Sequence, residues 1–91
     1  MTRVEYYALF IEELRRFQGL ERRRILDHMR SIERAPFATG PDRVELPPMH
    51  RPGTMQANFG EHAIRYFVLR DDAEGITTIV FLRVFRRPDW H

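Results

Sequence analysis

Two apolar, strand-like runs joined by a short polar turn constrain the fold more than any other feature of the sequence. The runs cover residues 63–69 and 76–85, and residues 71–75 between them read Asp-Asp-Ala-Glu-Gly. Two such runs separated by a few turn residues that include glycine predict a β-hairpin. Strands joined by a short turn pair antiparallel. The last third of the chain is therefore predicted to form one antiparallel strand pair.

Two amphipathic helices are predicted ahead of this hairpin. Apolar residues recur at helical spacing through residues 9–17 and again through 21–34, with charged residues between them. Gly19 interrupts the pattern and Pro36 ends it. The gap is short enough for an antiparallel helical hairpin. The two apolar stripes are Phe10, Leu14 and Phe17, then Ile25, Leu26, Met29 and Ile32.

The remaining segments complete a small α+β domain. Residues 3–7 are predicted as an edge strand, residues 55–59 as a further strand, and residues 35–54, with five of the six prolines, as a long loop. The predicted order is β-α-α-β-β-β, with the N-terminal helical hairpin packed on one face of an antiparallel sheet. The 91 residues suffice for a single domain, 1–91, with one core.

Composition excludes several kinds of chemistry. Cysteine is absent, and all fifteen basic residues are arginine, so thiolate and lysine chemistry are ruled out while bidentate recognition of phosphate is well supplied. The four histidines lack metal-ligand spacing, and neither a metal nor another cofactor is expected. No apolar run approaches the ~20 residues of a membrane span, and no signal core is recognisable. We expect a cytoplasmic protein without a membrane partner.

Alternation along the predicted hairpin separates two faces of the sheet. With the turn centred near Ala73, Arg65 would lie opposite about Phe81, with Arg83 as its diagonal neighbour. The even positions, through Val80 and Leu82, are mostly apolar and should meet the helices. Guanidiniums between aromatic rings suit phosphates and stacked bases, although an ordinary solvent face is the alternative. The odd positions are Arg65, Phe67, Phe81, Arg83, Phe85 and Arg87.

Residues 86–91 read Arg-Arg-Pro-Asp-Trp-His, which gathers two guanidiniums, an indole and an imidazole directly after the second strand. Clustered cations of this kind favour an anionic ligand, and the aromatic ring favours nucleic acid. His91 could act as an acid or a base near neutral pH.

These features together resemble the RelE/ParE superfamily of bacterial toxin–antitoxin toxins. Gly60 followed by residues 63–68 is similar to the family strand "G-x-Y-R-hydrophobic-x-Y", with an insertion before Arg65. Residues 83–87 followed by Trp90 resemble the basic pair and the aromatic residue that end the next family strand, where many members carry tyrosine. The helical hairpin fits as well, so the resemblance covers nearly the whole chain.

The resemblance implies a toxin, and it leaves the target open. RelE-like members cut mRNA in the ribosomal A site by attack of a ribose 2′-hydroxyl on the adjacent phosphate, without a metal. ParE-like members poison DNA gyrase and are not known as nucleases. A degenerate module that only binds its antitoxin is a third reading. The implied partners are a cognate antitoxin and either the ribosome with its mRNA or gyrase, and a homodimer is one state open to the free chain.

The resemblance also implies site residues. Arg65 would bind phosphate and stabilise the transition state, Trp90 would stack on a base, and His91 would give a proton to the leaving oxygen. Residues 54–58, where related nucleases often carry lysines, contain no base, so His50, Arg51, His62 or His91 would have to compensate. The expected catalytic residues are Arg65, Arg83, Arg86 and His91, and the expected substrate-binding residues are Arg51, Phe67, Arg87 and Trp90.

Overall fold

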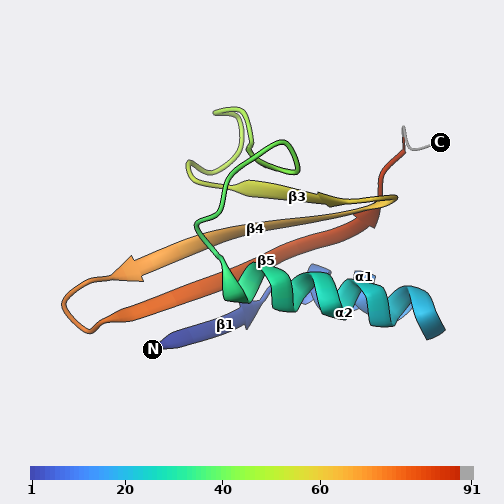
Figure 1. The fold of residues 1–91 in the computed structure, drawn as a ribbon, viewed down its shortest axis with the longest axis horizontal. Coiled ribbons are helices and arrows are strands. Elements are labelled where there is room, and N and C mark those ends of the chain that lie inside the picture. Colours follow the sequence, from blue (N-terminus) through green and yellow to red (C-terminus); the bar gives the residue numbers. More distant parts are fainter. Residues whose placement is uncertain (89–91) are drawn as a thin grey trace.

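The computed structural model describes residues 1–88 as two helices and one five-stranded sheet (Figure 1). The predicted order of elements is confirmed, with one addition, because a short strand lies inside the predicted loop 35–54. The elements are β1 (Thr2–Tyr6), α1 (Ala8–Arg16), α2 (Gly19–Arg34), β2 (Arg43–Glu45), β3 (Met55–Phe59), β4 (His62–Asp71) and β5 (Ile76–Arg86).

The sheet has the strand order β1-β5-β4-β3-β2 and is mixed. Strand β4 pairs antiparallel with both β3 and β5, as predicted, and the additional strand β2 pairs antiparallel with β3. Strand β1 departs from the predicted antiparallel sheet, because it pairs parallel with β5, from Thr2 opposite Thr77 to Tyr6 opposite Phe81. A parallel neighbour requires a long connection, and the helices with the other three strands supply it.

The core lies between the two helices and one face of the sheet. Both predicted helical stripes are buried there, with Leu26 only partly covered. Gly19 starts α2 with a φ of +59°, a left-handed conformation that lets the chain turn sharply between the helices. Among the described residues, no helix is long and apolar enough to cross a membrane. The sheet contributes Ala57, Ile64, Tyr66, Ile79, Phe81 and Val84 to this core.

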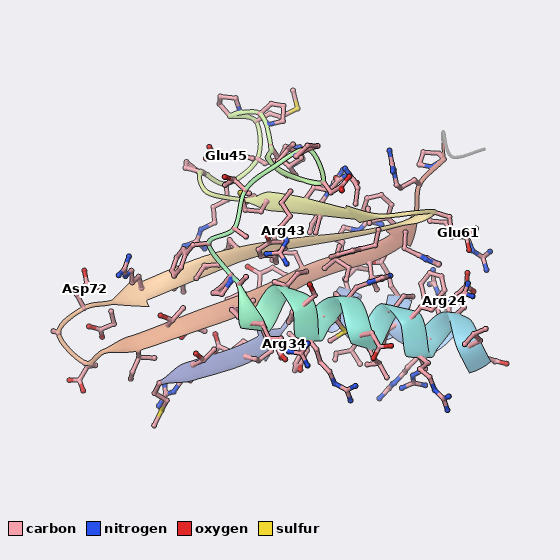
Figure 2. The ribbon with its side chains drawn as sticks, viewed as in Figure 1. Arg24, Arg34, Arg43, Glu45, Glu61 and Asp72 are labelled. Atoms are coloured by element: carbon pink, nitrogen blue, oxygen red, sulfur yellow. The ribbon has the colours of Figure 1, made fainter. Side chains whose placement is uncertain are left out.

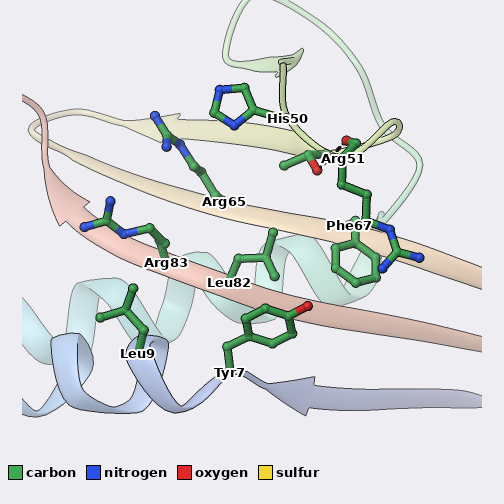
Figure 3. Close-up of a pocket in the computed structure, with 9 residues that line it drawn as sticks. Tyr7, Leu9, His50, Arg51, Arg65, Phe67, Leu82 and Arg83 are labelled. Atoms are coloured by element: carbon green, nitrogen blue, oxygen red, sulfur yellow. Dashed lines mark hydrogen bonds between the residues drawn. The ribbon is translucent and has the colours of Figure 1, made fainter. Parts of the chain in front are cut away.

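A β-bulge in β5 decides which of its side chains meet the helices. The ladder pairs Arg65 with Arg83 but Tyr66 with Phe81, so Leu82 is an extra residue. Phe81 is fully buried in the core, whereas Leu82 projects on the opposite face beside Arg83 (Figure 3). The predicted alternation had Val80, Phe81 and Leu82 on the wrong faces, because one extra residue inverts the phase of a strand. The predicted diagonal neighbours Arg65 and Arg83 are direct partners, because the bulge and a turn centred between Ala73 and Glu74 each shift the register by one residue.

Arg43 fastens the start of β2 to the end of α2 (Figure 2). Its guanidinium donates hydrogen bonds to the backbone carbonyls of Ser31, at 3.0 Å, and of Ala35. A cation at this position offsets the partial negative charge that accumulates at the C-terminal end of a helix. The long segment between α2 and β3 is therefore tied to the helix near its beginning.

The bulge yields a prediction about stability. Phe81→Ala is expected to lower the free energy of unfolding by about 3–5 kcal/mol, because it leaves a cavity beside Phe10, whose ring centroid lies 5.3 Å away. Leu82→Ala, on the half-exposed face, is expected to cost about 1 kcal/mol. Urea unfolding followed by circular dichroism measures both. Equal losses, or a greater loss for Leu82→Ala, would contradict the bulged register.

Candidate functional site

A shallow pocket of about 310 Å³ lies on the face of the sheet that carries Arg65 and Phe67 (Figure 3). Four segments that are far apart in sequence meet there, namely the start of α1, the long loop, β4 and β5. The pocket brings together four of the expected site residues, Arg51, Arg65, Phe67 and Arg83. The complete lining is Tyr7, Leu9, His50, Arg51, Thr54, Arg65, Phe67, Leu82 and Arg83.

Arg65 and Arg83 are direct partners across the β4–β5 ladder. Both guanidiniums approach the ring of Phe85, at 5.1 and 5.4 Å from its centroid. Arg65 donates from Nε to the side-chain oxygen of Gln56 at 3.0 Å, and no acidic group among residues 1–88 forms an ion pair with it. Two adjacent guanidiniums attract an anion, and the charge of Arg65 is available for one.

Arg83, in contrast, is held by a carboxylate that the sequence analysis did not single out. Glu13 of α1 accepts hydrogen bonds from Arg83 Nη2 at 2.7 Å and from Nε at 3.3 Å. These bonds raise the pKa of Arg83 above its ordinary value. Glu13 follows Phe10 by three residues and precedes Phe17 by four, so helical spacing places it on the buried stripe. That spacing was the sequence signal for this residue.

The other end of the pocket is formed by the long loop and Phe67. The guanidinium of Arg51 lies over the ring of Phe67, 4.1 Å from its centroid (Figure 3). Phe67 is buried, while Arg51 is exposed. A guanidinium stacked on a ring is a typical surface for contact with a nucleobase or a phosphate.

Hydrogen bonds within the loop fix the segment that carries His50 and Arg51. The backbone N–H of Leu46 donates to the carbonyl of Thr54 at 2.8 Å and closes the loop. The N–H of His50 donates to the carbonyl of Pro47 at 3.0 Å, and the hydroxyl of Thr54 donates to the carbonyl of Arg51 at 2.7 Å. Among residues 1–88, His50 is the histidine that lines the pocket, and these bonds hold its backbone there.

Arg86 is not brought together with Arg65 and Arg83. It lies against the helices, where it donates to both carboxylate oxygens of Glu21, at 2.7 and 3.0 Å. Glu21 also contacts the buried imidazole of His62, 2.9 Å from Nε2. Arg87 donates to the carbonyl of Gly60 at 3.2 Å. The expected site residues Trp90 and His91 lie outside the described residues.

Within residues 1–88, a single group of side chains has the composition and spacing of a metal site. It consists of Glu21, Glu61 and His62. The guanidinium of Arg86 already donates to both carboxylate oxygens of Glu21, so the positive charge beside this cluster is supplied by a side chain. Its geometry is that of an ion-pair network that links α2 to the end of β5.

The sequence matches no family model and no curated protein. Solved structures match the fold over most of the chain. A YoeB/ParE toxin from Agrobacterium tumefaciens superposes with a TM-score of 0.73 at 16% identity, over 93% of this chain and 98% of that chain. The chain has the RelE/ParE toxin fold.

Further structures with this fold are similar to the chain. The archaeal RelE–RelB complex from Pyrococcus horikoshii gives a TM-score of 0.69 at 19% identity, over 97% of each chain. The RelBE2 toxin–antitoxin complex from Mycobacterium tuberculosis gives 0.59 at 24% identity, over 93% of this chain and 96% of that chain. The RelE/ParE fold expected from the sequence is confirmed.

The ion pair at the edge of this RelE/ParE fold predicts a pH dependence. The hydrogen bond from Arg86 lowers the pKa of Glu21 below its ordinary 4.5, more than burial raises it. Because the pKa of Glu21 is depressed in the folded state, the stabilisation is complete above the ordinary pKa of 4.5. It is lost as the pH falls through the folded pKa. Glu21→Gln should therefore lower the free energy of unfolding at neutral pH, and its effect should shrink on acidification below the ordinary pKa of 4.5.

Urea unfolding of both proteins across this pH range measures the difference. Glu12→Gln is the matched control, because Glu12 is exposed on α1, and its effect should be close to zero throughout. A Glu21→Gln effect that stays constant into the acidic range would contradict the role of the ion pair.

Proposed function

We propose that this chain is the toxin of a toxin–antitoxin module and acts as a ribosome-dependent mRNA endonuclease. The main support is the pairing of Arg65 with Arg83 in an open pocket of a RelE/ParE fold. Arg65 has a neutral partner, Gln56, so its charge is free to meet a phosphate. The stacked Arg51 and Phe67 lie in the same pocket, at a place where a neighbouring nucleotide would lie.

The chemistry proposed for this pocket is attack of a ribose 2′-oxygen on the adjacent phosphorus. The new O–P bond forms while the bond to the 5′-oxygen of the next nucleotide breaks, which leaves a cyclic phosphate and a 5′-hydroxyl. Negative charge develops on the non-bridging oxygens, and preorganised donors such as Arg65 and Arg83 stabilise it. The reaction needs no metal.

Arginine does not exchange protons near neutral pH, so other groups must move them. We propose His50 as the base that accepts the 2′-hydroxyl proton, because it is the imidazole in the pocket. His91 is the proposed donor to the leaving oxygen, and Trp90 and Arg87 are the proposed contacts of the neighbouring nucleotide. Arg83 takes the role of the basic residue that ends the second family strand, because it lines the pocket, whereas Arg86 lies against the helices with Glu21.

The composition of β3 favours a second candidate function. Its residues read Met-Gln-Ala-Asn-Phe, and none of them can act as a base. A chain that only inhibits gyrase by contact, or one that only binds an antitoxin, needs no proton transfer there. These alternatives predict that His50 and Arg65 are dispensable for the effect of the protein.

Arg65→Ala is expected to lower mRNA cleavage roughly 10²-fold or more, because it removes a preorganised charge from the transition state. Its free energy of unfolding should barely change, since the side chain contributes little to the core. The assay is cleavage of mRNA on purified programmed ribosomes, with the new 5′ ends mapped by primer extension. Arg22→Ala is the control, because Arg22 is exposed on α2 and should leave cleavage close to wild type.

Parallel readouts separate the three functions. Full cleavage by both Arg65→Ala and Arg83→Ala would retain a nuclease but overturn the catalytic role proposed for the two arginines. Intact mRNA together with inhibited DNA supercoiling by gyrase would support the second candidate. Binding of the antitoxin with neither effect would support the degenerate module.

We also propose that a cognate antitoxin binds this chain. Similar structures from Pyrococcus horikoshii and Methanococcus jannaschii are complexes of RelE with RelB. The chain has a largely apolar groove of about 300 Å³ after the end of α2, where Phe37 is 55% exposed. Exposed apolar surface of this kind is typical of a protein–protein contact. The groove is lined by Pro36, Phe37, Ala38, Thr39, Glu45, Gly53, Met55 and Val68.

The antitoxin proposal predicts a small gene that overlaps or adjoins the gene for this chain, and it is tested by expressing the two genes together. Co-expression should relieve growth arrest, and the two proteins should purify together. Phe37→Asp should keep its toxicity but lose most of the binding, because a charge in the groove opposes apolar contact. Leu20→Asp, equally exposed on α2 but outside the groove, is the matched control. Full binding by Phe37→Asp would contradict the assigned surface, and light scattering on the free chain tests the homodimer.

A further inference from the structure

We infer that Glu13 is a positioning residue that gives Arg65 and Arg83 different tasks in the pocket. Glu13 does not line the pocket itself and acts through Arg83. The kinetic part of this inference rests on the proposed RNA cleavage, whereas its electrostatic part concerns anion binding alone.

Glu13 holds three donors at once. Besides Arg83 Nη2 and Nε, its carboxylate accepts the backbone N–H of Val84 at 3.2 Å. The side chain of Glu13 is only 8% exposed, while that of Arg83 is 43% exposed. The anchored end of this ion pair is therefore buried, and the cationic end remains open to the pocket.

The position of Glu13 follows from the end of β1. Pairing between β1 and β5 stops at Tyr6 and Phe81, and the N–H of Tyr7 closes it with a bond to the carbonyl of Phe81 at 3.0 Å. Beyond that point α1 continues beside β5, and Glu13 supplies the acceptor that a neighbouring strand would have given to Val84. The carboxylate is thus fixed to the backbone of the bulged strand.

This arrangement makes the two arginines unequal. Glu13 neutralises Arg83, whereas Arg65 is bonded to the neutral amide of Gln56. The pair then carries about one net positive charge instead of two. Arg65 supplies attraction for the anion, and Arg83 supplies a guanidinium of fixed orientation. A fixed donor favours the transition state over the ground state, which raises the rate without tightening substrate binding.

Glu13→Gln removes the charge and keeps the size of the side chain. Anion binding should become about threefold tighter or more, because a negative charge near the site is lost. The cleavage rate at saturating mRNA should fall about tenfold or more, because Arg83 is no longer held in position. The two effects have opposite signs. A purely structural role would instead lower both measurements together, in proportion to the folded fraction.

Anion affinity is measured by calorimetric titration of the free protein with sodium pyrophosphate. The cleavage rate is measured as kcat and KM on programmed ribosomes. Glu12→Gln changes net charge equally on the exposed side of α1 and should leave kcat and KM unchanged. In an Arg83→Gln background, Glu13→Gln should cause no further loss of kcat, because its effect passes through Arg83. Additive losses, or weaker pyrophosphate binding by Glu13→Gln, would overturn the inference.

A second comparison tests the unequal charges directly. Arg65→Gln should weaken pyrophosphate binding more than the double variant Glu13→Gln/Arg83→Gln does, because the double variant replaces a neutral ion pair with two amides whereas Arg65→Gln removes a net positive charge. Equal or reversed losses would reject the unequal roles. Absence of RNA cleavage by the wild type, with this order of binding intact, would reject the nuclease and retain the unequal charges of the two arginines. A wild type that binds no pyrophosphate would reject both.

Discussion

The pairing of β4 with β5, interrupted by one bulge, is the constraint on which the core and the pocket both depend. On one side of the interruption it turns Phe81 into the apolar core, and on the other it aligns Arg65 with Arg83. The extra residue, Leu82, joins the pocket lining. Because a strand has only two faces, the same register that completes the core also sets the distance between the two guanidiniums. Stability and anion recognition are consequently not independent in this fold.

The sequence was sufficient for the helices and the central hairpin but not for the phase of β5. The helices follow from apolar spacing, and the hairpin follows from the polar turn at residues 71–75. Through Val80, Phe81 and Leu82, however, every side chain is apolar, so alternation gives no indication of which one faces the helices. The parallel pairing of β1 was missed for a similar reason, since its partner lies about 75 residues away and local pattern carries no information about it.

The candidate site was predictable where its residues lie on one strand pair and not where it draws on distant elements. Arg65, Phe67 and Arg83 follow from alternation, and they share the pocket. The grouping of Arg86 with them was not reproduced, because Arg86 meets Glu21 on the helices, a contact over 65 residues. Glu13 was noted only as one of the charged residues between the apolar positions of the first helix. Only the tertiary structure reveals that it lies within 2.7 Å of Arg83.

Arg43 gives the pocket a mechanical link to the far side of the molecule. It anchors the beginning of the long loop to the last carbonyls of α2, and the same loop later carries His50 and Arg51. Phe37 lies between Ala35 and Arg43 in the sequence, three residues after the end of α2, and lines the apolar groove. A partner that moved the end of α2 would therefore pull on the pocket through the loop, without touching any residue that lines it. The end of α2 and the pocket are thus mechanically connected, although they share no residue.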